Sequence, residues 1–196
     1  MDQLTPNPEP HPALRSEYIR AWPVMIGGIA VGEYRIRPIT PADRAGVLDL
    51  FVHLSAKSRY FRYAHAMSTL PEALLNAIIH ATKKDDLALV AMIQNEDGSE
   101  TLAGIARFIK DVHGTEGEFS LSVSDEHHRE GIGSHLMQGI VDCSKLNGLC
   151  TIYGQVDKKN ADMISLMRHL KFDLKTSEED PHSFIACHRN ASNKQA

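Results

Sequence analysis

The sequence has few cysteines, and their spacing excludes the two structural uses that cysteines most often have. Cys143, Cys150 and Cys187 are the three cysteines among 196 residues, and no two of them form a Cys-x-x-Cys pair. An odd number without that pair fits neither a disulfide framework nor a four-cysteine zinc site. We therefore expect reduced thiols in a cytoplasmic protein.

Long apolar runs and an excess of basic residues are also missing. The longest apolar stretch, Val24–Val31, contains two glycines and is far shorter than a membrane span, which takes about 18 residues. The first ten residues, MDQLTPNPEP, lack the basic start and apolar centre of a secretory signal. With 21 Lys and Arg against 25 Asp and Glu, the formal net charge of −4 disfavours nonspecific binding to nucleic acid. We expect neither a membrane nor a nucleic-acid partner.

The chain nevertheless carries enough apolar material for one well-packed domain. Hydrophobic residues make up 42% and charged residues 23% of the 196 residues, as in ordinary globular proteins. Four prolines in residues 1–17, with little apolar content around them, leave that segment unable to bury a core. We predict a flexible tail over residues 1–17, a single domain over residues 18–189 and a disordered tail over residues 190–196.

The order of hydrophobic patterns predicts a mixed α/β fold. Strands are expected over residues 34–37, 87–93, 101–109, 119–123, 150–156 and 183–187, and helices from Thr40, Ser68, Ile132 and Asn160. The resulting order is β-α-α-β-β-β-α-β-α-β. A strand meander followed by β-α-β-α-β implies a mixed sheet with helices on both faces.

The most informative segment runs from Val123 to Met137. A strand ends there, a polar loop follows, and Gly131 and Gly133 precede a long amphipathic helix. The unpaired N–H groups and the positive dipole end of a helix start attract an anion, and glycine lets the backbone approach a phosphate closely. The alternative is a tight turn that binds nothing.

Two other phosphate-binding motifs do not fit this segment. The sequence has no Gly-x-x-x-x-Gly-Lys-Ser/Thr pattern, which excludes a P-loop. Leu136 occupies the position of the third glycine of a Gly-x-Gly-x-x-Gly pattern, and the loop follows the late strands rather than the first. A Rossmann dinucleotide site is therefore a poor interpretation.

The loop resembles motif A of the GNAT N-acetyltransferases, whose pyrophosphate loop reads Arg/Gln-x-x-Gly-x-Gly/Ala. Here residues 128–133 read His-Arg-Glu-Gly-Ile-Gly. Residues 34–63 resemble the start of the acetyltransferase domain of bacterial protein-lysine acetyltransferases of the Pat type. Residues 160–172 resemble the family's later helix, so the resemblance covers residues 34–188. It implies the GNAT fold and an acetyl-CoA-dependent transfer to an amine.

Three residues depart from the family pattern. His128 stands where Gln or Arg is usual, and Arg129 stands where Gly is frequent. Because the loop works through backbone N–H groups, we expect cofactor binding to survive, with both side chains able to contact phosphate. Lys171 replaces the glycine usual before the phenylalanine, and a left-handed backbone there would carry strain of about 1 kcal/mol.

The resemblance also implies which residues hold acetyl-CoA. The expected ligands are Leu121, Ser122, Val123, His128, Arg129, Glu130, Gly131, Ile132, Gly133, Ser134 and Asn160. The pantetheine arm would lie along the strand before the loop like an added strand. The N–H groups of Leu121 and Val123 would then stabilise the oxyanion that develops on the thioester.

An amine acceptor must lose a proton before it attacks a thioester, because a free lysine amine has a pKa of about 10.4. Glu118, at the start of the same strand, matches the general base of Pat-like sequences, and partial burial would raise its pKa. Glu116 is the alternative base, and a solvated carboxylate with no role is the simpler interpretation. Met167 occupies the position where many relatives carry a tyrosine as general acid, so that role is empty here.

Metal chemistry is not expected, although the chain has 11 histidines. His127, His128 and His135 cluster near the loop, but no His-Glu-x-x-His or similar spacing is present. The segment Ser58-Arg59-Tyr60-x-Arg62 also resembles Pat-like domains. It could line the acceptor side or simply pack the first two helices together.

The sequence therefore predicts an acetyl-CoA-dependent N-acetyltransferase that works by direct attack in a ternary complex. By resemblance, the acceptor is a protein lysine, with a small-molecule amine second. A non-catalytic acyl-CoA-binding regulatory module and a plain interaction domain are the alternatives. The sequence leaves the oligomeric state, monomer or dimer, and the acyl-chain preference open.

Overall fold

A computed structural model of the whole chain describes residues 20–26, 29–63, 67–83, 85–112 and 114–190. The strands are β1 (Arg20–Ile26), β2 (Ile29–Pro38), β3 (Thr82–Lys83), β4 (Asp86–Gln94), β5 (Glu100–Lys110), β6 (Glu116–Val123), β7 (Thr151–Asp157), β8 (Asp173–Thr176) and β9 (Ser183–Arg189). The helices are α1 (Arg44–His53), α2 (Ala56–Tyr63), α3 (Glu72–Ile79), α4 (Ile132–Leu146) and α5 (Ala161–His169), with single 3₁₀ turns η3 (Pro41–Asp43) and η4 (Asp125–His127).

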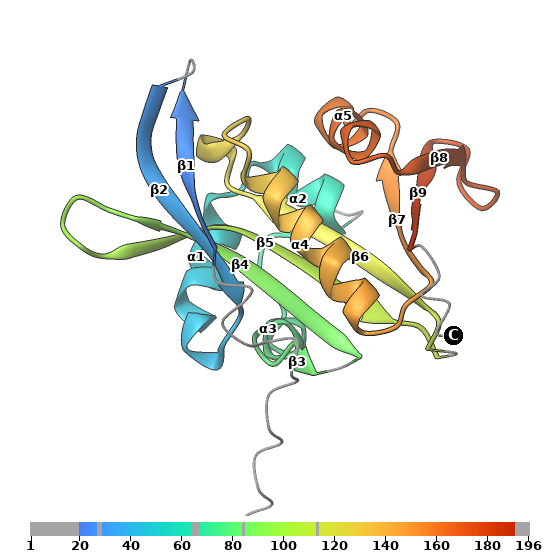
Figure 1. Cartoon of the computed structure of the whole chain (residues 1–196), viewed down its shortest axis with the longest axis horizontal. Coiled ribbons are helices and arrows are strands. Elements are labelled where there is room, and N and C mark those ends of the chain that lie inside the picture. Colours follow the sequence, from blue (N-terminus) through green and yellow to red (C-terminus); the bar gives the residue numbers. More distant parts are fainter. Residues whose placement is uncertain (1–19, 27–28, 64–66, 84, 113, 191–196) are drawn as a thin grey trace, which may run out of the picture.

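The described strands form one mixed sheet (Figure 1). Their order is β1-β2-β4-β5-β6-β7-β9-β8, and β3 pairs with β4 beside this path. Every pair is antiparallel except β6 with β7, which run parallel. The chain reaches β7 from β6 through α4, as a crossover between parallel strands requires.

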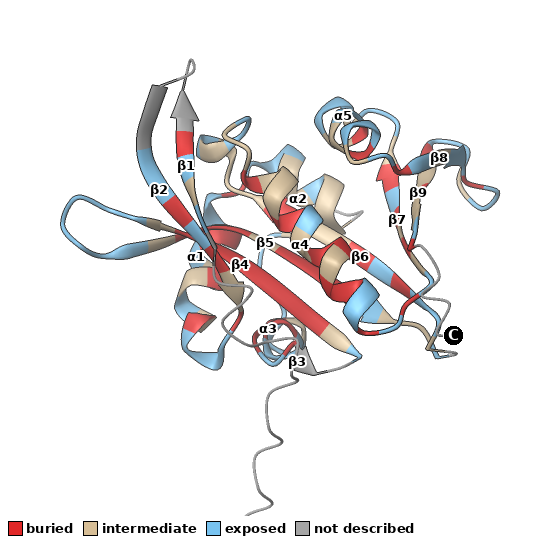
Figure 2. Cartoon of the chain, viewed as in Figure 1, coloured by how far each residue is buried: buried red, intermediate tan, exposed pale blue. Residues whose placement is uncertain are grey.

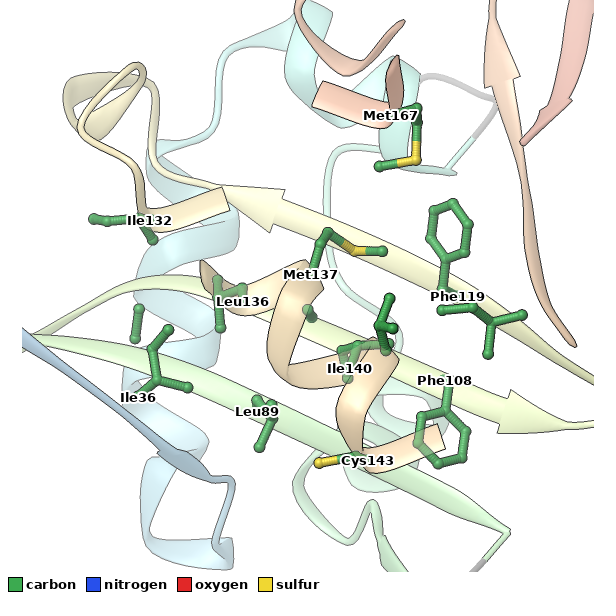
Figure 3. Close-up of a cluster of buried hydrophobic side chains, with 14 of the residues drawn as sticks. Ile36, Leu89, Phe108, Phe119, Ile132, Leu136, Met137, Ile140, Cys143 and Met167 are labelled. Carbon is green, nitrogen blue, oxygen red and sulfur yellow. The ribbon is translucent and has the colours of Figure 1, made fainter. Parts of the chain in front are cut away.

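Two hydrophobic clusters cover the two faces of the sheet. Figure 2 shows that buried residues concentrate along the middle strands β4 and β5. On one face, α4 lies across the middle strands and its Leu136, Met137 and Ile140 are fully buried against them. Figure 3 shows these three side chains directed at the strands that carry Leu89 and Phe108. On the opposite face, α1 and α3 pack a separate cluster. The sheet therefore has helices on both faces, as the sequence predicts.

Some elements were not expected from the sequence. Strand β1 pairs antiparallel with β2, so the apolar stretch around residues 24–31 contributes to two adjacent strands rather than one. Helix α2 has no buried residue. Its sequence, AKSRYFRY, lacks the apolar stripe from which a helix can be predicted. The short strands β3 and β8 also lack a clear periodic signal.

The predicted boundaries of the domain fall partly outside the described residues. Residues 1–17 and 191–196, assigned to tails from the sequence, lie outside them. Asn190, assigned to the C-terminal tail, is buried, and its Nδ2 donates to Ser144 Oγ at 2.9 Å and to Leu149 C=O at 2.8 Å. The packed chain thus includes this residue.

Lys171 has the left-handed backbone that the sequence suggested, with φ of 61°. It follows α5, where Lys171 N–H donates to Arg168 C=O at 3.1 Å and Phe172 N–H donates to Met167 C=O at 2.9 Å. This pair of hydrogen bonds is a Schellman ending, which normally places glycine at the left-handed residue. The lysine there carries the conformational cost that a glycine avoids.

Candidate active site

The candidate site begins where β6 and β7 separate (Figure 1). The two strands pair at three positions, and the last pair joins Glu118 to Tyr153. Beyond it, β6 continues to Val123 and β7 to Asp157 with no further register pair between them. We call this part, residues 119–123 of β6 and 154–157 of β7, the β6/β7 opening.

The backbone groups of β6 alternate between its two neighbours. The alternation follows from three hydrogen bonds: Ser124 N–H to Ala103 C=O at 2.8 Å, Asp111 N–H to Glu116 C=O at 2.9 Å, and Cys150 N–H to Thr115 C=O at 2.8 Å. Even-numbered residues therefore turn their backbone groups toward β5, and odd-numbered residues turn theirs toward β7. The N–H groups of Leu121 and Val123 consequently face the opening, where the sequence analysis expects the thioester arm.

The turn after β6 presents backbone donors beside this opening. Gly131 adopts φ of 88° and ψ of −12° immediately before α4, and His135 N–H donates to Gly131 C=O at 3.1 Å. Within the described chain, the N–H groups of residues 131–134 have no hydrogen-bond acceptor. Unsatisfied N–H groups at the positive end of a 15-residue helix make this turn a place for an anion.

Gly133 lies where α4 approaches β6 and α5. A Cβ atom built there would contact Leu121 and Leu166 at 3.6 Å and Val123 at 3.7 Å, which are ordinary van der Waals distances. Packing within the chain would therefore tolerate a methyl group at this position. The absence of a side chain leaves the backbone open to close approach at this position.

Arg129 and His128 are both exposed at the outer edge of the turn. Arg129 adopts φ of 68°, and its guanidinium lies 3.5 Å from the Asp162 carboxylate of α5. His128 Nε2 donates to Val123 C=O at 3.1 Å, a carbonyl that faces the opening. The structure thus places His128 at the mouth of the opening and Arg129 between the turn and α5.

The remaining residues of the turn face the protein. Ile132 is buried in the core, and Ser134 is half-buried on the first turn of α4. The Glu130 side chain is only 12% exposed and accepts a hydrogen bond from His127 Nδ1 at 3.0 Å. Burial, assisted by the negative charge of Glu130, raises the pKa of Tyr34 to about 12. Glu130 therefore lies on the β2 side of the turn.

An aromatic group supports α4 from behind. The Tyr34 hydroxyl of β2 forms a hydrogen bond with Nδ1 of His135, and the Trp22 ring of β1 stacks on the His135 ring at 4.6 Å between centroids. Burial lowers the pKa of His135, which favours the neutral imidazole. The sequence analysis missed Trp22 and Tyr34, because no local pattern links residues this far apart.

Asn160 and Met167 belong to α5 at the β7 side. The Asn160 side chain caps the helix, and its Oδ1 accepts from Met163 N–H at 3.1 Å. This residue, predicted as a cofactor ligand, thus also fixes where α5 begins. Met167 is fully buried in the core, so α5 carries no phenol at this position.

Glu118 is the residue at which the β6/β7 opening starts. It is exposed, whereas the sequence analysis expected partial burial. Burial, followed by the charges of Glu118, Asp111 and Glu116, raises the pKa of Tyr153, the residue opposite Glu118 on β7. Glu116 is also exposed, but it lies inside the paired part of the strands.

Helix α2 packs on the face of the sheet that carries Glu118. The Arg62 guanidinium donates to Ser120 Oγ at 2.9 Å, and the Ser58 hydroxyl donates to Asp125 Oδ1 at 2.7 Å. Burial alone would raise the pKa of Asp125, but hydrogen bonds from Ser55 and Ser58 and the nearby His128 lower it overall. Two residues of the Ser58–Arg62 segment therefore attach α2 to β6 and to the turn that follows β6.

The described residues contain no group of three or more His, Cys, Asp or Glu side chains that could hold a metal ion. In the same part of the chain, no helix has the length and apolar character needed to cross a membrane.

The chain that carries this fold and this candidate site matches a family of acyltransferases. Residues 48–172, more than half of the chain, match the family model described as the acetyltransferase (GNAT) family. The chain therefore belongs to the GNAT acetyltransferase family, and the resemblance seen in the sequence is confirmed.

Individual relatives agree with this assignment. Acetyltransferase PA5475 of Pseudomonas aeruginosa is 26% identical over 146 residues, which cover 74% of this chain and 76% of that protein. The GNAT domain of PAT from S. lividans has the same fold, with a TM-score of 0.77 and 20% identity over 90% of this chain and 99% of that one. The acetyltransferase yncA of Salmonella typhimurium, solved with its cofactor acetyl-CoA, has a TM-score of 0.64 and 17% identity over 83% and 99% of the two chains.

Proposed function

We propose that this protein transfers an acetyl group from acetyl-CoA to a primary amine, by direct attack in a ternary complex. The observation that carries the proposal is the adjacency of two sets of unpaired backbone donors. One set is the N–H groups of residues 131–134, and the other is the N–H groups of Leu121 and Val123 in the β6/β7 opening. An acyl donor with a diphosphate and an extended arm that contains amide groups has hydrogen-bond acceptors for both sets of N–H groups.

The residues proposed to hold acetyl-CoA are those expected from the sequence except Ser122, whose backbone groups face β5 and whose side chain faces α2. Leu121 and Val123 would align the arm along β6, residues 128–134 would surround the diphosphate, and Asn160 would close the β7 side. The bound donor supplies an acetyl thioester. The exposed guanidinium of Arg129 adds positive charge beside the turn, at a distance of 3.5 Å from Asp162.

Glu118 is the general base in this proposal. Its carboxylate takes the proton from the acceptor amine, and the amine nitrogen forms the bond to the thioester carbonyl carbon. The N–H groups of Leu121 and Val123 stabilise the oxyanion, and the C–S bond breaks to release a thiolate. A thiol has an ordinary pKa of about 8.5, so the leaving group needs no strong acid, in keeping with the buried Met167.

The acceptor that we favour is a protein lysine, because residues 34–63 resemble the Pat-type domains and because the S. lividans PAT domain shares the fold. A small-molecule amine is the second choice. We place the enzyme in the cytoplasm, where acetyl-CoA and protein lysines meet.

The test replaces Glu118 by Gln and follows thiol release from acetyl-CoA over a panel of amines. We expect kcat to fall by about 10²–10⁴ while the affinity for acetyl-CoA stays nearly the same. Glu116→Gln is the matched comparison, since it removes the alternative base, another exposed carboxylate two positions earlier on the same face. Unchanged turnover in Glu118→Gln would exclude this residue as the base. Acetyl-CoA binding by the wild type without transfer to any amine would favour a regulatory binding module instead.

A further inference from the structure

A small cavity lies between the sheet and helices α1, α2 and α3, on the face that carries Glu118, and six of its eleven lining residues are apolar. Its polar lining consists of Arg62 and Tyr63 from α2, Arg107 from β5, and Ser120 and Ser122 from β6. Its volume is about 20 Å³, the space of one water molecule or of the tip of a carboxylate. A tetrahedral phosphate is too large for this space without movement of the lining.

The two arginines of the cavity differ in their partners. Arg107 is paired with the Asp86 carboxylate, and its Nε donates to Oδ1 at 2.6 Å. Arg62 donates to the neutral Ser120 hydroxyl at 2.9 Å and lies over the Tyr63 ring at 4.9 Å from its centroid. Across the described residues, no carboxylate lies within ion-pair distance of Arg62.

Arg62 is therefore a cation that the protein only partly compensates. Burial lowers the pKa of its guanidinium, Arg107 lowers it further, and Tyr63 and Glu118 act in the opposite direction. A guanidinium nevertheless stays protonated in proteins, so the charge remains. A half-buried charge without an opposite charge is costly, and an anion placed beside it would gain a strong hydrogen bond.

Ser122 provides an independent indication of a ligand. Its side chain lines the same cavity, and the residue is 8% exposed. Its Oγ atom is buried and, among the described residues, has no hydrogen-bond partner. Buried hydroxyls are nearly always paired, so an unpaired one that lines the same cavity as a partly compensated cation indicates a missing acceptor.

We propose that this cavity is the acceptor-side subsite of the enzyme and that it binds a carboxylate carried by the amine substrate, held by Arg62 and Ser122. This inference rests on the proposed function, because it names the class of amine that Glu118 would deprotonate. The carboxylate is either the acid group of a small amino acid or an acidic side chain next to the target lysine.

The spacing along β6 fixes the distance between amine and carboxylate. Glu118 and Ser120 lie two residues apart on one face of the strand, which is about 7 Å, and Ser122 lies about 7 Å further along. Helix α4 covers the other face, so the cavity is separated by the sheet from the proposed site of the diphosphate. A small amine with its carboxylate about six bonds away spans the interval from Glu118 to Ser120, where Arg62 donates, and the longer linkage from a lysine amine to a neighbouring glutamate carboxylate spans the interval to Ser122.

The experiment compares matched acceptors that differ only in charge. The small-molecule pair is 6-aminohexanoate and 6-aminohexanamide, and the peptide pair has Glu or Gln next to one lysine. We expect the wild type to prefer the acidic member of one pair by about tenfold to hundredfold in kcat/KM, mainly through KM. The pair that shows the preference identifies the source of the carboxylate.

Substitutions then test which residues produce the preference. Arg62→Gln should reduce the ratio between acidic and neutral acceptors to near one, and Arg62→Lys should restore part of it. Ser122→Ala should reduce the ratio about threefold, and it removes only a hydroxyl that the fold does not pair. Lys57→Gln is the control, because Lys57 is an exposed cation on the same helix.

Three results would overturn the proposal. One is a wild type that shows no preference in either pair. Another is a preference that persists in both Arg62→Gln and Ser122→Ala. The third is an equal loss for acidic and neutral acceptors in Arg62→Gln together with a shifted pH–rate profile, because Arg62 would then act through Glu118.

A binding measurement without turnover separates this proposal from the proposed function. The peptide pair is made with norleucine in place of lysine, and the affinity of each peptide is measured by calorimetry. Tighter binding of the Glu peptide, lost in Arg62→Gln, supports the subsite even if no amine is acetylated. Acetyl transfer with equal affinity for both peptides and equal rates for both members of the small-molecule pair would retain the enzyme and reject the subsite.

Discussion

Strand β6 has two edges that behave differently. Toward β5, its residues pair without a break from Gly117 with Lys110 to Val123 with Gly104. Toward β7, pairing ends at Glu118. One edge therefore holds the sheet together, and the other leaves backbone donors for a ligand. In the proposed function, fold stability and substrate binding are therefore divided between alternate residues of a single strand.

The largest expected effect comes from placing proline on each edge in turn. Leu121→Pro removes an N–H that faces the opening, so we expect the fold to persist and kcat to fall by about 10²–10³. Ser122→Pro removes an N–H that faces β5, and we expect unfolding to become easier by about 1–3 kcal/mol. Initial rates and urea midpoints of both variants measure the two effects. The comparison fails if Ser122→Pro is as stable as the wild type or if Leu121→Pro retains full kcat.

The pH dependence of stability tests whether buried His135 stabilises the start of α4 beside the β6/β7 opening. Burial lowers the folded-state pKa of His135 below its ordinary value of 6.5, and burial followed by Lys145 does the same for His188. The unfolded chain therefore binds more protons just below pH 6.5, so this contribution to stability is complete above that pH and is lost as the pH falls. We expect urea midpoints to decrease between pH 7.5 and 5.5.

His135→Gln provides the control for that measurement. It should make the decrease smaller without removing it, because His188 still titrates in the same direction. The pKa values of Asp43 and Asp125 lie below the ordinary 3.8, so these carboxylates do not titrate in this range. An identical decrease of the urea midpoint in wild type and variant would mean that the protonation of His135 does not contribute to the pH dependence of stability.

The smallest expected effect concerns the strained residue behind the opening. Lys171→Gly places glycine at φ of 61°, and we expect a gain in unfolding free energy of up to about 1 kcal/mol with no change in kcat or KM. Lys175→Gly, on strand β8, should instead lower stability. Thermal and urea unfolding measure both changes. A loss of stability in Lys171→Gly would show that the lysine side chain outweighs the strain of its backbone.

Much of the fold was predictable, because its main elements carry their own periodic signal. The strict alternation of residues 119–123 and the apolar stripe of α4 correspond directly to the observed strand and helix. Helix α2 was missed, since it is held by Asp125 and Ser120 rather than by an apolar stripe of its own. Strand β1 was missed because the apolar stretch shared with β2 gives no sign of where the chain turns.

The candidate site was predictable only where backbone chemistry follows from the local sequence. Gly131 adopts a positive φ, which glycine takes without strain, and Lys171 adopts the left-handed backbone that its place in the family pattern suggested. The exposure of Glu118 and the contact of Tyr34 with His135 depend on strands that meet only in the folded protein. The unpaired hydroxyl of Ser122 likewise depends on how α2 packs against β6, which the local sequence does not reveal.

The most direct test of the account is a titration of the ¹⁵N-labelled protein with acetyl-CoA, followed through its backbone amide resonances. The account predicts that the amides of residues 131–134 and those of Leu121 and Val123 shift most. The amides of Ser120 and Ser122, which donate toward β5, should shift much less. Shifts confined to the outer surface of α5 and β9, or equal shifts at odd and even positions of β6, would contradict it.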